Sequence, residues 1–384
     1  MRALRLPLVA VFVAGAFVLS HCGGGGDDTP GPSQLTSKTV SMNGAQVVPA
    51  VIVPAFGTGG FTIDMGSGAI QGTVFTTNVS GTAAHIHEAA VGANGAVVVT
   101  LEDGGGGNFR VPAGTMLTSS QLDSLKNGNL FVDVHTAANP NGEIRGQIGR
   151  TVFFSTLTPG QETPPTTSTA SGLGVFVFDP ESGTMSGTVT TSGVVGVASH
   201  MHIGAIGSPA AVAIPFTGGP SNYTMPPTVL TADQITSLGK GLFYANVHSA
   251  ANPNGEVRGQ LYIPVRVANL TGAQETPPNS STGIGQGVFV VDPATRAVAG
   301  IETWQGVVGA TDSHIHVSAG PGVAGGIVIR GTVTLGTSGS LKIASSAPLA
   351  DNLFAGFMLN NLYYNVHSAT FPSGEIRGQL SITP

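Results

Sequence analysis

Short apolar runs alternate along the chain with clusters of glycine, proline, aspartate and serine. Residues 174–178 form such a run, the turn-forming segment 179–183 follows it, and a second strand-like run spans residues 184–190. Two strand-length runs joined by a turn of this kind predict a β-hairpin. Corresponding turn segments occur at 64–68 and 292–295, so we expect the same hairpin three times.

A helical pattern interrupts the predicted strands late in each third of the chain. Segments 118–121 and 231–234 read Thr-Ser-Ser-Gln and Thr-Ala-Asp-Gln, and each precedes a short apolar face. A threonine followed three residues later by glutamine forms a capping box, which satisfies free backbone N–H groups at the start of a helix. No such box precedes Leu353 in the last third. We therefore expect one short helix per third, two of them capped by side chains.

The whole pattern is written three times, at a spacing of about 115 residues, which is the length of a domain rather than of a solenoid repeat. We place the copies at residues 38–150, 151–265 and 266–384. Regular short strands with frequent turns are typical of sandwiches and barrels. The predicted fold class is therefore all-β, with three tandem β-sandwich or Greek-key barrel domains and one short helix in each.

The first residues predict export. Two arginines precede the apolar run 6–19, which has the length of a signal sequence. The run ends at Leu-Ser-His-Cys22, which resembles a bacterial lipobox, so we predict a signal peptide at 1–22, lipidation of Cys22 and a flexible tether at 23–37. His21 departs from the small residue usual before that cysteine. An ordinary cleaved signal with an incidental cysteine is the alternative.

Composition narrows the choice of function. Charged residues make up 9% of the chain, the net charge is −6, and there are 14 lysines and arginines without a basic stripe, so we expect no nucleic-acid partner. Cys22 is the single cysteine, so no intrachain disulfide can form. Burial, backbone pairing or a metal must hold the domains together.

Histidines are the main candidates for chemistry. Alternate residues on a strand share a face, so His-x-His presents two imidazoles side by side, and a third from a neighbouring strand can complete a metal site. Neutral imidazole suits Zn and Cu, and we predict one such ion per domain. Nine of the ten histidines form three equivalent trios: His85, His87 and His135; His200, His202 and His248; His314, His316 and His367.

An alternative interpretation is that the trios are packed, hydrogen-bonded neutral histidines. The residues between the paired histidines, such as Ile86, should face the core in either case. On the strand of the third histidine, an aromatic and a polar residue share its face and could support a site. These residues are Phe131 and Asp133, Tyr244 and Asn246, and Tyr363 and Asn365.

Two further motifs recur. Glu, Arg and Gln alternate in the closing segments 143–147, 256–260 and 375–379. An arginine there could orient an anion or a partner, but we favour a cross-strand ion pair or polar ladder that fixes strand register. The proline-rich segment Gln-Glu-Thr-Pro-Pro at 161–165 and 274–278 is expected at a sheet edge, because proline cannot donate to a ladder.

Together, the Gln-Glu-Thr-Pro-Pro segments, the His-x-His pairs, the Val-His dipeptides and the Glu-x-Arg-Gly-Gln endings resemble the CHRD domain. That domain is known from chordin, an extracellular antagonist of bone morphogenetic proteins, and from bacterial secreted proteins. The first copy departs from it at Gln46-Val47, and the third at Phe371-Pro372-Ser373. The resemblance covers the exported part of the chain and implies an extracellular domain without a settled activity.

The His-x-His and later Val-His are also similar to the copper ligands of Cu/Zn superoxide dismutases. A fourth bridging histidine, a zinc-ligand loop and a disulfide pair are missing. Three functions remain. The first is a lipid-anchored surface or envelope binding or adhesion protein with an unknown extracellular or envelope ligand, attached to the membrane through Cys22 and not an enzyme. The others are a copper-dependent oxidoreductase and a passive envelope spacer.

Overall fold

A computed structural model describes residues 34–345 and 347–382. The predicted signal peptide and Cys22 lie outside this part of the chain. The first strand begins at Leu35, so residues 35–37 belong to the first domain and not to the predicted tether. Across the described residues, no helix combines the length and apolarity needed to cross a membrane.

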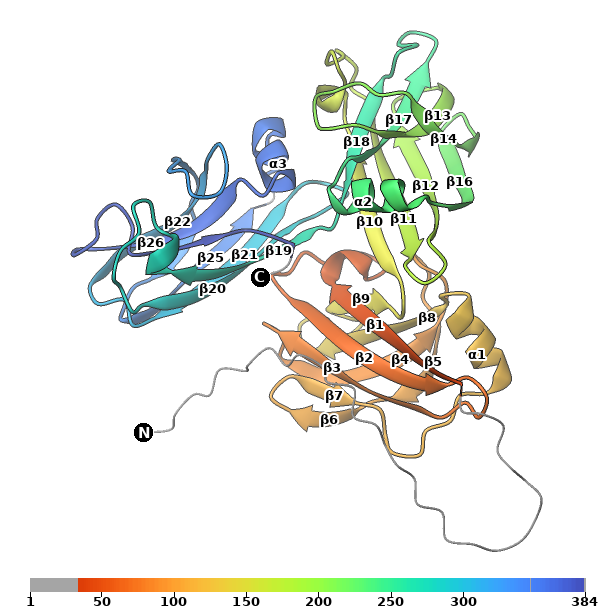
Figure 1. The fold of residues 1–384 in the computed structure, drawn as a ribbon, viewed down its shortest axis with the longest axis horizontal. Coiled ribbons are helices and arrows are strands. Elements are labelled where there is room, and N and C mark those ends of the chain that lie inside the picture. Colours follow the sequence, from red (N-terminus) through yellow and green to blue (C-terminus); the bar gives the residue numbers. More distant parts are fainter. Residues whose placement is uncertain (1–33, 346, 383–384) are drawn as a thin grey trace, which may run out of the picture.

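The described chain forms three domains, each built on a nine-stranded antiparallel sheet with one short helix, which confirms the all-β prediction (Figure 1). Domain 1 consists of β1 (Leu35–Asn43), β2 (Phe56–Asp64), β3 (Ile70–Thr77), β4 (Gly81–Glu88), β5 (Ala96–Thr100), β6 (Glu102–Gly105), β7 (Asn108–Arg110), α1 (Ser119–Lys126), β8 (Leu130–Thr136) and β9 (Ile144–Gln147).

Domain 2 repeats this order. Its elements are β10 (Thr151–Leu157), β11 (Ser171–Asp179), β12 (Thr184–Ser192), β13 (Gly196–Ile203), β14 (Val212–Pro215), β15 (Thr217–Gly218), β16 (Asn222–Val229), α2 (Ala232–Gly239), β17 (Phe243–Ser249) and β18 (Val257–Tyr262). The hairpin predicted at 174–190 is β11 and β12.

Domain 3 completes the series. Its elements are β19 (Val265–Thr271), β20 (Ile284–Val291), β21 (Val298–Gln305), β22 (Ala310–Val317), β23 (Gly326–Ile329), β24 (Thr332–Thr334), β25 (Ser338–Ser345), α3 (Asp351–Met358), β26 (Leu362–Ser368) and β27 (Ile376–Gln379). Short 3₁₀ helices, η1 (Gly44–Gln46), η2 (Pro159–Gln161) and η3 (Gly272–Gln274), follow the first strand of each domain.

Each sheet folds over on itself near its middle. In domain 1 the strand order is β5-β4-β8-β9-β1-β2-β3-β7-β6, and β9 and β1 share only the register pair Arg145–Asn43. The two halves therefore face each other across one core. Ile86 of β4 packs there with Phe61 of β2 and Val74 of β3.

The helices start where the sequence predicts. Thr118 and Thr231 each complete a capping box with the glutamine three residues on, and α3 has no side-chain cap at Ala350. In α1, Leu122 and Leu125 are buried in the domain core. Each helix leads into the strand that carries the third histidine.

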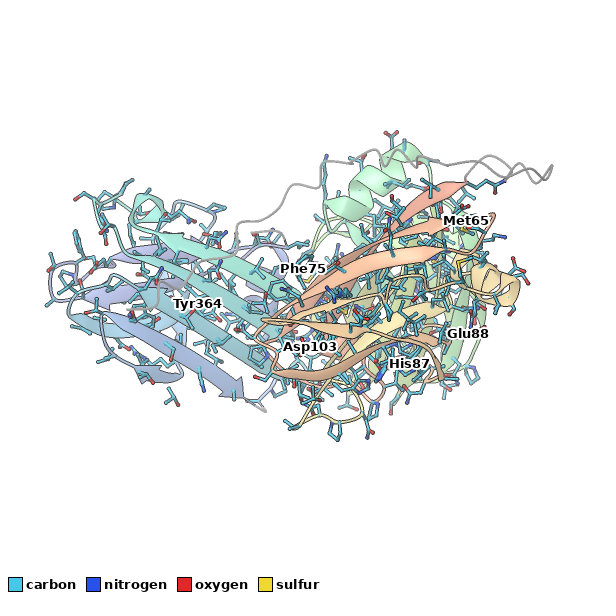
Figure 2. The ribbon with its side chains drawn as sticks, turned by 90° about the horizontal axis from the view of Figure 1, so that it is seen from below. Met65, Phe75, His87, Glu88, Asp103 and Tyr364 are labelled. Carbon is cyan, nitrogen blue, oxygen red and sulfur yellow. The ribbon has the colours of Figure 1, made fainter. Side chains whose placement is uncertain are left out.

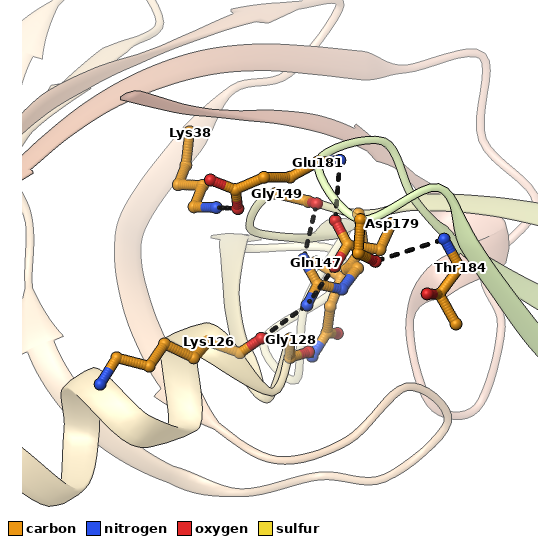
Figure 3. Close-up of polar contacts among 10 residues, drawn as sticks. Lys38, Lys126, Gly128, Gln147, Gly149, Asp179, Glu181 and Thr184 are labelled. Carbon is orange, nitrogen blue, oxygen red and sulfur yellow. Dashed lines mark hydrogen bonds and ion pairs between the residues drawn. The ribbon is translucent and has the colours of Figure 1, made fainter. Parts of the chain in front are cut away.

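Neighbouring domains contact each other directly. Arg150 donates to the carbonyl oxygens of Lys126 and Gly149 and pairs with Asp179 of domain 2 at 3.2 Å (Figure 3). Domains 2 and 3 share apolar packing, in which the Tyr262 ring meets the Phe354 ring edge-on at 5.1 Å.

Candidate metal centres

The histidine trio of domain 1 lies on the face of β4 and β8 that points away from the core. His87 pairs with Phe131 and His85 with Asp133 in the ladder between these strands, and His135 follows two residues after Asp133 (Figure 2 labels His87). The side chain between the paired histidines turns inward, as predicted: Ile86 is fully buried.

The structure brings each predicted trio together. In domain 1, the ring centroids of His85 and His135 lie 4.9 Å apart, those of His85 and His87 5.5 Å, and those of His87 and His135 6.3 Å. One nitrogen from each of these rings, together with a carboxylate oxygen of Asp133, forms a group whose atoms all lie within 4.8 Å of one another. Such a group could hold a metal ion.

Domains 2 and 3 repeat this geometry. The centroid distances are 4.9 Å for His200–His248 and 6.3 Å for His202–His248. They are 4.9 Å for His314–His367 and 5.7 Å for His316–His367. Here the ligand groups consist of the three histidines alone.

Backbone carbonyls fix two of the three rings in every domain. His87 Nδ1 lies 3.0 Å from the oxygen of Gly95, and His135 Nδ1 lies 2.9 Å from that of Pro140. A carbonyl only accepts, so each Nδ1 carries the proton and each Nε2 keeps a free lone pair. The equivalent contacts are His202–Ala210, His248–Pro253, His316–Gly325 and His367–Pro372.

The remaining histidine of each trio uses Nδ1 toward the cluster. His85 Nδ1 lies 3.0 Å from His135 Nε2, and His200 Nδ1 lies 3.0 Å from His248 Nε2. In domain 3, Asp312 lies 2.6 Å from Nε2 of His314, which leaves Nδ1 of that ring for the cluster.

Several of these inward nitrogens are buried without a hydrogen-bond partner. A buried polar atom left unsatisfied costs about 1–3 kcal/mol, so folded proteins rarely contain one without a reason. One metal ion in each domain would satisfy the inward nitrogens of that domain. The hydrogen bonds to backbone carbonyls also fix the ring tautomers that present the neutral nitrogens Zn or Cu requires. The atoms are Nε2 of His87, His202, His316 and His367, and Nδ1 of His314.

A three-layer stack supports each site. The His87 ring lies parallel to the Phe131 ring at 4.9 Å with 7° between the planes, and the Arg145 guanidinium lies 3.5 Å from the centre of the same ring. Because β8 runs between β4 and β9, the histidine and the arginine approach the aromatic ring from opposite sides. The predicted aromatic support is thus present. The equivalent stacks are His202–Tyr244–Arg258 and His316–Tyr363–Arg377.

Of the ion pair and the polar ladder predicted for these arginines, no ion pair is found in the described residues, whereas Arg258 does donate to Gln260, two residues further along the strand, at 3.3 Å. Arg258 also donates to the carbonyl oxygens of Ala205 and Ser208, both at 2.9 Å, in the loop after the histidine pair. That loop also supplies Ala210, the acceptor for His202. The buried arginine is therefore a positioning residue, and the sequence pattern alone gave no sign of its loop contacts.

The proline-rich segment does not lie at a sheet edge, contrary to the prediction. It follows β10, an inner strand, and the Gln161 side chain bridges the strands by donating to Thr156 O and accepting from Gln260 N. The next residue, Glu162, is buried and accepts hydrogen bonds from the Asn246 amide at 2.9 and 3.2 Å. The segment therefore closes over the polar face beside the histidines.

Asp133 contacts the rings more closely than the sequence indicated. Its Oδ1 lies 3.0 Å from His87 Nε2 and 2.9 Å from His135 Nε2. Neither His87 Nε2 nor Asp133 Oδ1 has a partner with hydrogen-bond alignment. The carboxylate oxygen is thus placed as a fourth candidate ligand rather than as a neighbour of the site.

The pKa values of the histidines depend on whether a carboxylate contacts the rings. Burial lowers the pKa of His200, His202 and His248, and it lowers the pKa of His316 to about 4. In domain 1, burial opposes protonation of His87, but the contact with Asp133 leaves the pKa of this histidine raised. Domain 2 accordingly presents neutral imidazoles at neutral pH.

Comparison with known proteins agrees with the repeated motifs. A family model described as the CHRD domain matches residues 38–148, 153–261 and 266–380, which is most of the chain. The chain belongs to the CHRD domain family. CHRD domains are extracellular binding-type domains, which supports export of this protein. A search of curated protein sequences found no match.

Proposed function

We propose that this CHRD protein is an exported, lipid-anchored surface or envelope binding protein whose three domains each bind one Zn or Cu ion. The observation that carries the metal proposal is that the two nitrogens of one imidazole ring have different surroundings. His202, for example, donates from Nδ1 to the carbonyl oxygen of Ala210 and turns Nε2, which is buried and has no hydrogen-bond partner, toward two other ring nitrogens.

The packing alternative accounts for less of this arrangement. Histidines that only tie strands together would use both ring nitrogens in hydrogen bonds. In domain 3, three inward nitrogens, from His314, His316 and His367, are buried without a partner. One ion with bonds of about 2.0–2.1 Å would satisfy them at once.

Binding to an extracellular or envelope ligand rests on the family and on the architecture. Three similar domains in one chain offer repeated binding surfaces, which raise avidity without new contacts. Attachment through Cys22 rests on the lipobox-like sequence. A passive spacer would need neither repeated sites nor oriented imidazoles.

The copper-oxidoreductase alternative receives less support. It would use the arginine after each Val-His to guide an anionic substrate. In domain 2, however, Arg258 is 2% exposed, lies against Tyr244 and donates to two backbone carbonyls. A superoxide-decay assay on copper-loaded protein tests this function, and activity above that of free copper with denatured chain would restore it.

Metal content of the purified exported chain tests the metal proposal. After loading with Zn or Cu and dialysis, we expect about three ions per chain by mass spectrometry, one for each group in the structure. His87→Asn should lower this to about two. Less than one ion per chain, with no rise in melting temperature on adding either metal, would refute the proposal.

The neighbouring residue offers a matched control. Glu88 follows His87 on β4, so its side chain leaves the strand on the other side, and its carboxylate accepts a hydrogen bond from Ser124 at 2.5 Å. Glu88→Gln should therefore keep three ions. Equal loss in both variants would indicate that β4 has been disturbed, rather than that a ligand has been removed.

A further inference from the structure

Each histidine trio has one buried carboxylate beside it, but not at the same position. Domain 1 has Asp133 on the strand of the third histidine and Val47 in the segment after its 3₁₀ helix. Domain 2 has Asn246 and Glu162 at these positions. Domain 3 repeats domain 2 with Asn365 and Glu275. The buried acidic group has therefore exchanged places, and domain 3 has in addition the partly exposed Asp312 on the outer nitrogen of His314.

The exchange changes what the carboxylate touches. Asp133 reaches the cluster directly, within 3.0 Å of two ring nitrogens. Glu162 is held one residue further out, because the Asn246 amide stands between it and the rings and donates to both of its oxygens. In domain 1 the carboxylate belongs to the ligand group, and in domain 2 it supports a neutral amide.

We propose, building on the metal-binding function above, that domain 1 holds zinc in a closed His₃Asp site, whereas domains 2 and 3 hold their metal through three histidines and leave one position for water or a small anion. Four protein ligands are typical of structural zinc, and three ligands with an open position are typical of sites that bind a further ligand. The three domains are then not equivalent. Domain 1 retains metal, and domains 2 and 3 carry the exchangeable sites.

A competing explanation is that the carboxylate only balances the buried arginine of the stack. Burial lowers the pKa of Arg145 to about 10, and the charge of Asp133 counteracts that effect. Glu162 counteracts the lowered pKa of Arg258 in the same way, while burial raises the pKa of Glu162 itself to about 7. Charge balance alone requires an acid near the arginine, but it does not require Asp133 Oδ1 to lie between two imidazole nitrogens.

Variants of the full exported chain that keep only one metal site allow the domains to be measured separately. His202→Asn with His316→Asn leaves the site of domain 1, and His87→Asn with His316→Asn leaves that of domain 2. Competition with a chelator should show zinc bound at least about tenfold more tightly in the first protein. With Co²⁺ as the probe, azide should change the visible spectrum of the second protein and leave that of the first unchanged.

Reciprocal substitutions test the cause. Asp133→Asn in the first protein should lower zinc affinity at least about tenfold and make its cobalt spectrum respond to azide. Glu162→Val with Asn246→Asp should give the second protein the closed behaviour of domain 1. If Asp133→Asn lowers only the melting temperature, or if azide perturbs both parent proteins equally, the inference fails. If neither parent binds zinc or cobalt, the metal-binding function itself fails.

Discussion

A buried glutamate in the core of domain 3 allows a quantitative test of how this domain is stabilised. Glu302 on β21 is fully buried, and its carboxyl group accepts a hydrogen bond from the hydroxyl of Ser313, the residue before His314. The equivalent position, opposite the same glycine of the hairpin, is Val74 in domain 1 and Val189 in domain 2. Domain 3 thus carries an acid where its sister domains carry an apolar side chain.

Burial raises the pKa of Glu302 from 4.5 to about 8, against the lowering effect of the Ser313 hydrogen bond. The folded domain therefore keeps a proton that the unfolded chain releases above pH 4.5. Stability is present below that pH and falls as the pH rises toward 8. Each pH unit within this window costs about 1.4 kcal/mol, so from pH 5 to pH 7 the contribution of Glu302 to the stability of domain 3 should fall by about 3 kcal/mol.

Glu302→Gln removes the titration while keeping a polar partner for Ser313. The chain has one tryptophan, Trp304, which is buried in the same core, so its fluorescence during urea unfolding reports on domain 3. With chelator present to exclude metal, the variant and the unmodified chain should be similar at pH 5, and the variant more stable by about 3 kcal/mol at pH 7. Curves that stay parallel over this range would refute the assignment of a protonated Glu302.

Three further predictions follow from the sites and the helices. Removing metal from a chain held at about 1,000 times its dissociation constant should cost about 4 kcal/mol, seen as a lower melting temperature that zinc restores; an unchanged melting temperature would contradict occupied sites. Arg258→Met should cost about 0.5–2 kcal/mol in urea unfolding and weaken zinc binding in domain 2, because the loop that orients His202 loses its anchor; unfolding without weaker binding would limit the arginine to a structural role. Thr231→Ala should destabilise domain 2 by about 1 kcal/mol, while Ala350→Ser should stabilise domain 3, and equal effects of both would argue against the capping assignment.

The parts of the fold that depend on nearby residues could be predicted from the sequence. The capping boxes need a threonine and a glutamine three positions apart, and the hairpin needs two runs and a turn. The His-x-His face follows from the period of a strand. The third histidine was predictable for a different reason, since recurrence of the trio in three copies pointed to neighbouring strands, and the structure places His135 beside His85.

Contacts between segments that are far apart in the chain could not be predicted from the sequence. The sequence places the proline-rich segment at a sheet edge because proline lacks a backbone N–H group. In the structure, the Gln161 side chain replaces the missing backbone pairing between β10 and β18 by donating to Thr156 O and accepting from Gln260 N. For the arginine of the closing strand, the sequence pattern favours a cross-strand ion pair or a polar ladder. In the structure, this arginine lies against an aromatic ring and donates to loop carbonyls, a choice that depends on a loop about 50 residues earlier in the chain.

The carboxylate exchange shows why a repeated sequence must be compared in space. Aligned by motif, Val47 looks like a lost glutamate and Asp133 like an unrelated drift, because the two positions are far apart in the chain. In the folded domain they are neighbours, for Gly142 lies close to both side chains just as Gly255 lies close to Glu162 and Asn246. Two substitutions that each look damaging alone therefore keep a buried carboxyl group beside the site and, in domain 1, move it into contact with the imidazoles. A duplicated domain can thus change how its metal is coordinated without changing any histidine.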